Sequence, residues 1–244
     1  VSLSSPVLSQ GKFESILALN ESGLKVQVID ATYDPEVTTL KVAMEALCHE
    51  AAAHVTGGAS VLVLSDRSIA ESRVPIHSLL ATGAVHHHLI NHGLRADSNL
   101  IIETGSARDS HQVSCLLGFG ATAIYPYLAY SVLADQLSSG EILGAPSVCY
   151  QNYRKGINKG LLKIMSKMGI SAVNSYRGAQ LFEAVGLDAE VVEMAFPGVS
   201  SRIAGAGFAH LGFDQKQLAR AARLKRKPVV AGGLLKYVHG GEYH

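Results

Sequence analysis

The sequence predicts an α/β fold with a mostly parallel sheet and flanking helices. Short apolar segments alternate with longer amphipathic ones five times along the 244 residues, as in strands joined by right-handed helical crossovers. Either an open doubly wound sheet or a partial barrel would satisfy this alternation. The first apolar segment runs into VIDATYD, without the glycine-rich fingerprint of a Rossmann domain, so a dinucleotide-binding unit is disfavoured.

Five apolar runs are the expected strands, and they cover residues 24–30, 60–66, 99–104, 121–126 and 169–175. The first helix is expected to follow Asp34 as N-cap, with Pro35 in its first turn and Gly57 and Gly58 at its end. Further helices are expected from Pro75 to about Gly93, over 110–117, from 127 to 137, over 150–168, and from Tyr176 onward.

The helix over 150–168 has two distinct faces. One is apolar, and the other carries a lysine every four residues (Lys155, Lys159, Lys163, Lys167), which is most often a solvated face. Periodicity fades after about Phe196. We therefore expect an α/β domain over residues 1–195 and a connecting segment over 196–244.

Composition excludes several classes of protein. A net charge of +1 gives no field that would attract nucleic acid or an anionic membrane. The uncharged stretch 112–134 is divided by Gly118, Gly120 and Pro126, so we expect buried elements there and no membrane span. The three cysteines are widely spaced, which favours a reducing, cytoplasmic location over a disulfide framework or a zinc knuckle.

The stretch AVHHHLINHGL (84–94) raises the question of a metal site. On a helix, His87 aligns with the apolar face, and only His88 and His92 have the four-residue spacing of metal ligands. Leu89 stands where the zinc-protease signature needs glutamate. Packing histidines are the favoured interpretation. The alternative is a self-sufficient metal-dependent enzyme that uses His88, His92 and Glu103, with His111 or His77 as other possible third ligands.

Polar side chains follow each predicted strand, where parallel α/β folds gather function. They include Asp30, Ser65–Asp66–Arg67, Glu103–Thr104, Arg108–Asp109 and Ser175–Tyr176–Arg177. Carboxylates beside arginines can hold a polar ligand, although internal ion pairs are the commoner use. We expect no metal, cofactor or catalytic residue from these patterns alone.

Several longer segments resemble the large subunit of glutamate synthase, in its central domain and the connection into its flavin domain. They are LSDR (64–67), HHHLINHGLR (86–95), ETGSARDSHQ (103–112), GFGATAIYPYLAY (118–130), the stretch 157–187 around KIMSKMGI, and GGLLKYVHGGEYH (232–244).

The resemblance implies an incomplete (β/α) barrel that joins the glutaminase and FMN-binding domains of one polypeptide and helps shape the passage of ammonia between them. The family forms two glutamates from glutamine, 2-oxoglutarate and two electrons, which come from ferredoxin or through a small NADPH-dependent subunit. FMN and an iron–sulfur cluster belong to the full-length enzyme, and neither is expected in this fragment, which would be inactive alone. Glu103, Arg108, Ser175, Tyr176 and Arg177 are our candidates for interdomain or tunnel-wall contacts.

Overall fold

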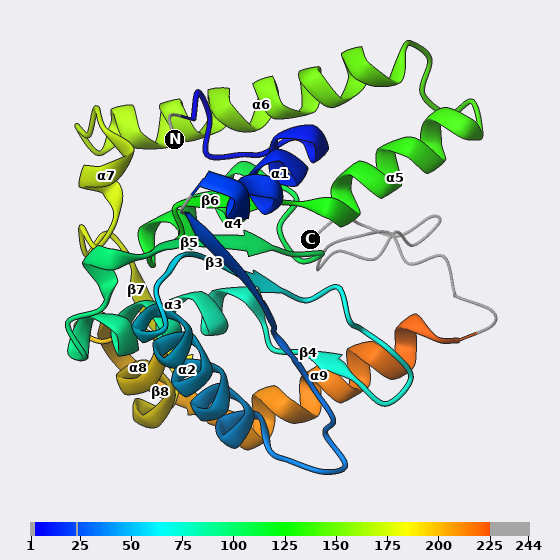
Figure 1. Ribbon diagram of the computed structural model, residues 1–244. Helices are drawn as coiled ribbons and strands as arrows, with labels where there is room; N and C mark the ends of the chain where they lie inside the picture. Colours follow the sequence, from blue (N-terminus) through cyan, green and yellow to red (C-terminus); the bar gives the residue numbers. More distant parts are fainter. Residues whose placement is uncertain (1–2, 23, 225–244) are drawn as a thin grey trace.

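A computed structural model describes residues 3–22 and 24–224 (Figure 1). Its centre is a four-stranded parallel sheet in the order β1 (Lys25–Asp30), β3 (Ala59–Ser65), β5 (Asn99–Glu103) and β6 (Ala123–Tyr125). These are the first four strands that the apolar runs predict, so the α/β class and the parallel pairing are confirmed.

The sheet is wound in one direction. Each new strand is added on the same side of the last one, and the crossover helices α2 (Leu40–Thr56), α3 (Ser78–Asn91) and α4 (Ser110–Gly118) all pack into one core with the same sheet face. A doubly wound fold would reverse the strand order part-way along the chain. The arrangement is that of a partial (β/α) barrel, and within residues 3–22 and 24–224 it does not close.

The other sheet face has its own core. Alternate strand residues such as Val63, Ile101 and Tyr125 pack there against α1 (Gln10–Leu17) and against Tyr130 of α5 (Tyr127–Ser138). The long helix α6 (Pro146–Lys167) contributes to both cores, with Ile157 and Leu161 in the first and Tyr153 beside the second. In Figure 1, α1 and α6 lie on one side of the sheet and α2 on the other.

The C-terminal part differs from the sequence-based expectation. Residues 169–175 do not form a fifth strand. Gly169, with a φ of +70°, ends α6, and a single turn, α7 (Val173–Tyr176), follows. The segment expected to open a helix at Tyr176 instead leads into β7 (Glu183–Leu187), because Gly178 and Gln180 adopt positive φ values that interrupt a helix.

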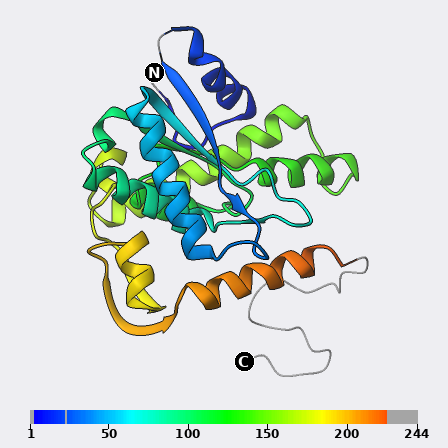
Figure 2. The same ribbon diagram turned by 60° about the horizontal axis from the view of Figure 1, so that its bottom comes forward.

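Beyond β7 the chain forms α8 (Ala189–Ala195), β8 (Ser200–Ala206) and α9 (Phe208–Ala222). β8 pairs in parallel with β7, so the division expected at residue 195 lies between two paired strands. α9 packs on α2 (Figure 2). It also packs on β4 (Val74–Pro75), which forms a small antiparallel pair with β2 (Thr32–Tyr33). The remaining short elements are the 3-10 turns η1 (Ala18–Ser22) and η2 (Arg95–Asp97). The predicted segment 232–244 lies outside the described residues.

The first crossover helix starts later than expected. Asp34 closes a turn, in which its carboxylate accepts from the amide of Glu36 at 2.9 Å, and Thr39 is the N-cap of α2. The lysine face of α6 is solvent-exposed, as expected. Among the described helices, none combines the length and the apolar character needed to cross a bilayer.

Candidate functional site

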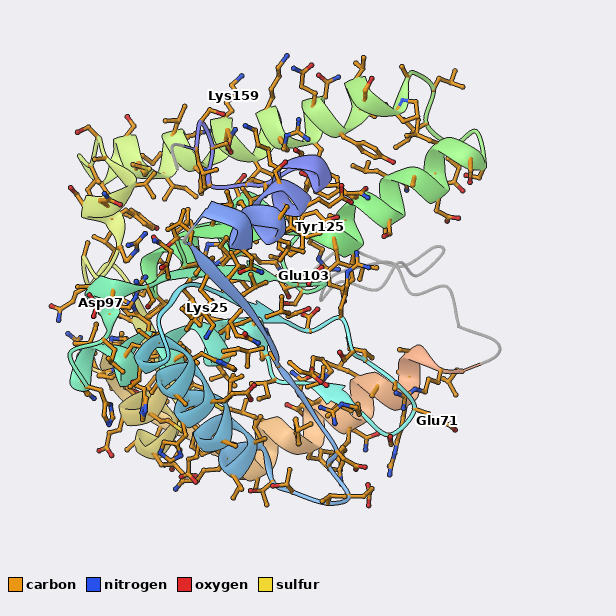
Figure 3. All side chains as sticks on the ribbon, viewed as in Figure 1. Lys25, Glu71, Asp97, Glu103, Tyr125 and Lys159 are labelled. Atoms are coloured by element: carbon orange, nitrogen blue, oxygen red, sulfur yellow. The ribbon has the colours of Figure 1, made fainter. Side chains whose placement is uncertain are left out.

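The carboxyl ends of β3 and β5 bring two buried carboxylates together. Glu103 is 7% exposed, and it accepts hydrogen bonds from the Ser65 hydroxyl at 2.6 Å and from Arg67 Nε at 2.8 Å. The guanidinium of Arg67 also lies over the ring of Tyr127, 4.5 Å from its centroid. Figure 3 shows Glu103 close to Tyr125, its register partner on β6.

Asp66 is the more enclosed acid of the pair. Its carboxylate accepts from the Thr104 hydroxyl at 2.5 Å and from the Gly105 amide at 3.0 Å, and the Tyr127 hydroxyl also donates to it. Burial raises the pKa of Asp66, although these hydrogen bonds oppose the rise. In turn, burial and then the charge of Asp66 raise the pKa of Tyr127, so its phenol stays protonated as a donor.

Hydroxyl groups continue from Asp66 toward the start of α3. Thr104 Oγ1 lies 3.0 Å from Ser106 Oγ, which lies 2.6 Å from Ser78 Oγ. Ser78 and Ser106 line a pocket of about 180 Å³ together with His77, His111 and Cys115. Burial raises the pKa of the Cys115 thiol, which therefore stays protonated and is a poor nucleophile. The arrangement offers a chain of groups that both donate and accept hydrogen bonds, beside a small cavity.

The five predicted contact residues do not meet at one end of the sheet. Glu103 lies in the carboxyl-end cluster, and Arg108 is exposed nearby, with its carbonyl accepting from Tyr153. Arg177, by contrast, donates to the carbonyl of Ala121, which precedes β6 at the amino end of the sheet. Ser175 is exposed on α7, while Tyr176 is 3% exposed and packs against Phe182. The expected clustering is wrong because 169–175 is not a strand.

The histidines also differ from the helical-wheel prediction. His86, not His87, is the buried one: it is 7% exposed, and its Nδ1 accepts from Arg95 Nε at 2.9 Å. The buried face of α3 is rotated about the helix axis from the predicted one, so Ile90, which the predicted face contains, is 47% exposed.

The metal-enzyme alternative fails on geometry. His88 and His92 stack with ring centroids 4.2 Å apart near the end of α3. Glu103 lies at the opposite end, where it lines one small cavity with Ser78 at the start of α3, and ten residues of helix separate Ser78 from His88, or about 15 Å. Among residues 3–22 and 24–224, no three His, Cys, Asp or Glu side chains gather as metal ligands.

Comparison with known proteins decides the family. Residues 1–188 match the family model described as the glutamate synthase central domain. This chain belongs to the glutamate synthase family. Over its whole length it is 41% identical to the chloroplastic ferredoxin-dependent glutamate synthase of Oryza sativa subsp. japonica, 38% identical to the ferredoxin-dependent enzyme of Pyropia yezoensis, and 36% identical to the large chain of the NADPH enzyme of Bacillus subtilis.

The chain spans 16–17% of the length of these glutamate synthases. Among solved structures, the flavin-binding domain of baker's yeast flavocytochrome b2 aligns with 95% of the chain and 46% of that domain at 13% identity, with a TM-score of 0.45.

The three cysteines of this glutamate synthase chain do not fit an iron–sulfur cluster. Cys48 lies on α2, Cys115 on α4 and Cys149 on α6, and all three are free. A cluster needs several thiolates on one centre, whereas among residues 3–22 and 24–224 no three Cys, His, Asp or Glu side chains lie close enough to share a metal.

Sequence reasoning noted Asp66 and Thr104 at the strand ends, but it missed Ser78, Ser106 and Tyr127. Ser78 and Tyr127 each begin a helix, so their place in the amphipathic pattern masked their position at the sheet edge. One signal was available, because the starts of crossover helices in parallel folds lie beside the carboxyl ends of the strands.

Proposed function

We propose that this chain joins the glutaminase and FMN-binding domains of a glutamate synthase and helps shape the ammonia passage between them, without catalysing the reaction alone. The conversion of glutamine, 2-oxoglutarate and two electrons into two glutamates would then need the remainder of the polypeptide. FMN, the iron–sulfur cluster and the contact with ferredoxin or a small NADPH-dependent subunit would belong to that remainder. Three free cysteines support a reducing compartment such as the cytoplasm.

The observation that carries the proposal is the hydroxyl chain from Asp66 through Thr104 and Ser106 to Ser78. Ammonia is a small molecule that both donates and accepts hydrogen bonds. Hydroxyl groups match it in both roles, and the adjoining pocket of about 180 Å³ leaves room for it.

Of the predicted contact residues, we propose Glu103 and Arg108 for this carboxyl end. Ser175 and Arg177 would serve a separate contact at the other end of the sheet, and Tyr176 would hold α7 in place. The division into 1–195 as the central unit and 196–244 as the connecting segment remains a prediction. Under this division, α8 would be the last element of the central unit.

The test uses the full-length enzyme and the substitutions Thr104→Val and Ser106→Ala. If the hydroxyls wall the passage, glutamine hydrolysis persists in the double variant. The glutamate formed from 2-oxoglutarate per glutamine hydrolysed then falls by about 5-fold or more, because loss of one polar contact costs about 1 kcal/mol. Ser15→Ala, which removes an exposed hydroxyl on α1, is the control and keeps full coupling. Unchanged coupling in a folded double variant would refute the proposal.

A further inference from the structure

A second pocket, of about 390 Å³, opens where α1, α5 and α6 meet the carboxyl end of the sheet. It lies on the sheet face away from α2 and α3, where the second core is formed. Its volume falls in the range of small-molecule sites. Its lining consists of Ser9, Gln10, Gly11, Arg67, Tyr125, Tyr127, Tyr130, Ser131, Ala134, Ser147, Tyr150 and Arg154.

The lining carries two positive charges and no negative one. Arg67 comes from the end of β3 and Arg154 from α6, whereas neither Asp nor Glu is among the lining residues. Arg67 forms an ion pair with Glu103, which is not among the lining residues. Arg154 contacts the Tyr130 hydroxyl, and no carboxylate in residues 3–22 or 24–224 forms an ion pair with it. The pocket lining is therefore cationic and holds one guanidinium with no ion-pair partner, while the charges of Glu14, Asp66 and Glu103 act on its tyrosines from outside the lining.

Tyrosine rings give this pocket fixed walls. Tyr125 stacks on Phe13 at a centroid distance of 4.4 Å, and Tyr130 is 8% exposed, with its hydroxyl donating to the carbonyl of Leu8 at 2.8 Å. Tyr127 holds the Arg67 guanidinium against its ring. A ligand would meet flat apolar surfaces that are already in place, with cationic groups beside them. Such preorganisation lowers the cost of binding.

We propose that this pocket binds a small organic carboxylate, with its anionic group on Arg154 and Arg67 and its carbon skeleton against the tyrosine rings. Guanidinium groups match the planar geometry of a carboxylate and form paired hydrogen bonds with it. Because the lining holds two guanidiniums and has carboxylates close behind it, the pocket suits a monocarboxylate or dicarboxylate and not a polyphosphate. The aromatic walls favour an anion with a carbon skeleton over inorganic phosphate.

The site is distinct from the proposed ammonia passage, and the inference does not depend on that function. The two are nevertheless neighbours. Tyr127 contributes its ring to this pocket and its hydroxyl to Asp66, and Arg67 divides its contacts between the pocket and Glu103. A bound carboxylate would compete with Glu103 for Arg67.

The test is calorimetric titration of the full-length protein that carries this chain, with benzoate, malonate and inorganic phosphate as probes. We expect saturable binding of at least one carboxylate below about 10 mM, and weaker binding of phosphate. Arg154→Gln weakens the carboxylate at least tenfold, and Arg154→Lys retains part of the affinity. Lys155→Gln removes the same charge from the adjacent, exposed position of α6 and leaves binding unchanged.

Three results would overturn the proposal: no saturable carboxylate binding, a preference for phosphate, or equal losses in the Arg154 and Lys155 variants. An acidic side chain of another domain that fills the pocket would also abolish carboxylate binding in the full-length protein, and that result would overturn the proposal as well. Circular dichroism of each variant establishes that it is folded, so a loss of binding in Arg154→Gln reports on the pocket itself.

Discussion

At the residue scale, His86 is held as a neutral imidazole by the groups around it. Its Nδ1 accepts a hydrogen bond from Arg95, so the ring proton is on Nε2. Burial, followed by the charges of Arg95, His87 and Arg177, lowers the pKa of His86 to about 3. A proton there would add a third charge beside two guanidiniums, and it would remove the acceptor that Arg95 uses.

This shift predicts how stability depends on pH. Between about pH 6.5 and about pH 3 the unfolded chain binds the proton that folded His86 refuses, so the free energy of unfolding falls with falling pH by up to about 1.4 kcal/mol per pH unit. Urea unfolding between about pH 4.5 and about pH 7 measures the slope. His86→Gln can retain an acceptor for Arg95 and should flatten the slope, whereas His210→Gln, at an exposed position, should not. Identical slopes in wild type and His86→Gln would contradict the assignment.

Two helical glycines give a matched pair for packing. A Cβ at Gly83 would overlap the carbonyl of Ala195, where α3 packs on α8, whereas one at Gly156 on α6 would meet nothing within 4 Å. We expect Gly83→Ala to lower the free energy of unfolding by about 1–3 kcal/mol through overpacking. Gly156→Ala should raise it by up to about 1 kcal/mol, because alanine favours a helix. Denaturant titration of both variants tests this, and a neutral Gly83→Ala would show that α8 can move away.

At the element scale, α4 depends on a cap next to the candidate site. The Asp109 carboxylate accepts from the Gln112 amide at 2.8 Å, and α4 then packs on α6 and α3. Asp109→Ala should lower the free energy of unfolding by about 1 kcal/mol. Asp109→Asn should retain most of that stability, because an asparagine side chain can accept the same hydrogen bond. Asp97→Ala, on a short 3-10 turn, is the control for loss of charge alone. If Asp97→Ala lowers the free energy of unfolding as much as Asp109→Ala does, the effect comes from the lost negative charge and not from the lost cap.

The same elements show how far the sequence could predict this molecule. Buried strands such as β3 are apolar on both faces, so their positions followed from composition, and Asp66 and Glu103 followed as strand-end residues. The segment 169–175 is also apolar at its start, yet Gly169 turns it out of the sheet. Whether Ser78 and Ser106 meet depends on how α3 approaches the sheet, and that is a tertiary property. Local pattern therefore located the two acids and Thr104, but not Ser78 and Ser106.

At the scale of the whole molecule, β7 and β8 form a parallel pair apart from the main sheet. Val185 and Ile203 are partners in register, and they are 68% and 59% exposed. On its other side the pair meets α8, whose Val191 and Ala195 are buried. Two strands alone are marginally stable, and a paired apolar face in solvent is unfavourable. The chain spans about a sixth of the length of its relatives, and we expect other parts of a longer polypeptide to cover this face.

Hydrogen exchange can test whether this face is covered. We expect the amides of Ser200–Ala206 to exchange about 10-fold or more slowly in the full-length protein than in the 244-residue chain, because cover worth about 1.4 kcal/mol slows local opening tenfold. The amides of β3, buried on both faces, should exchange alike in the two proteins and serve as the internal control. Ile203→Lys should reduce the protection of β8 in the full-length protein and leave β3 unaffected. Equal exchange of β8 in both proteins would mean that the pair is stable with its apolar face in water, and the expected domain contact would then have to lie elsewhere.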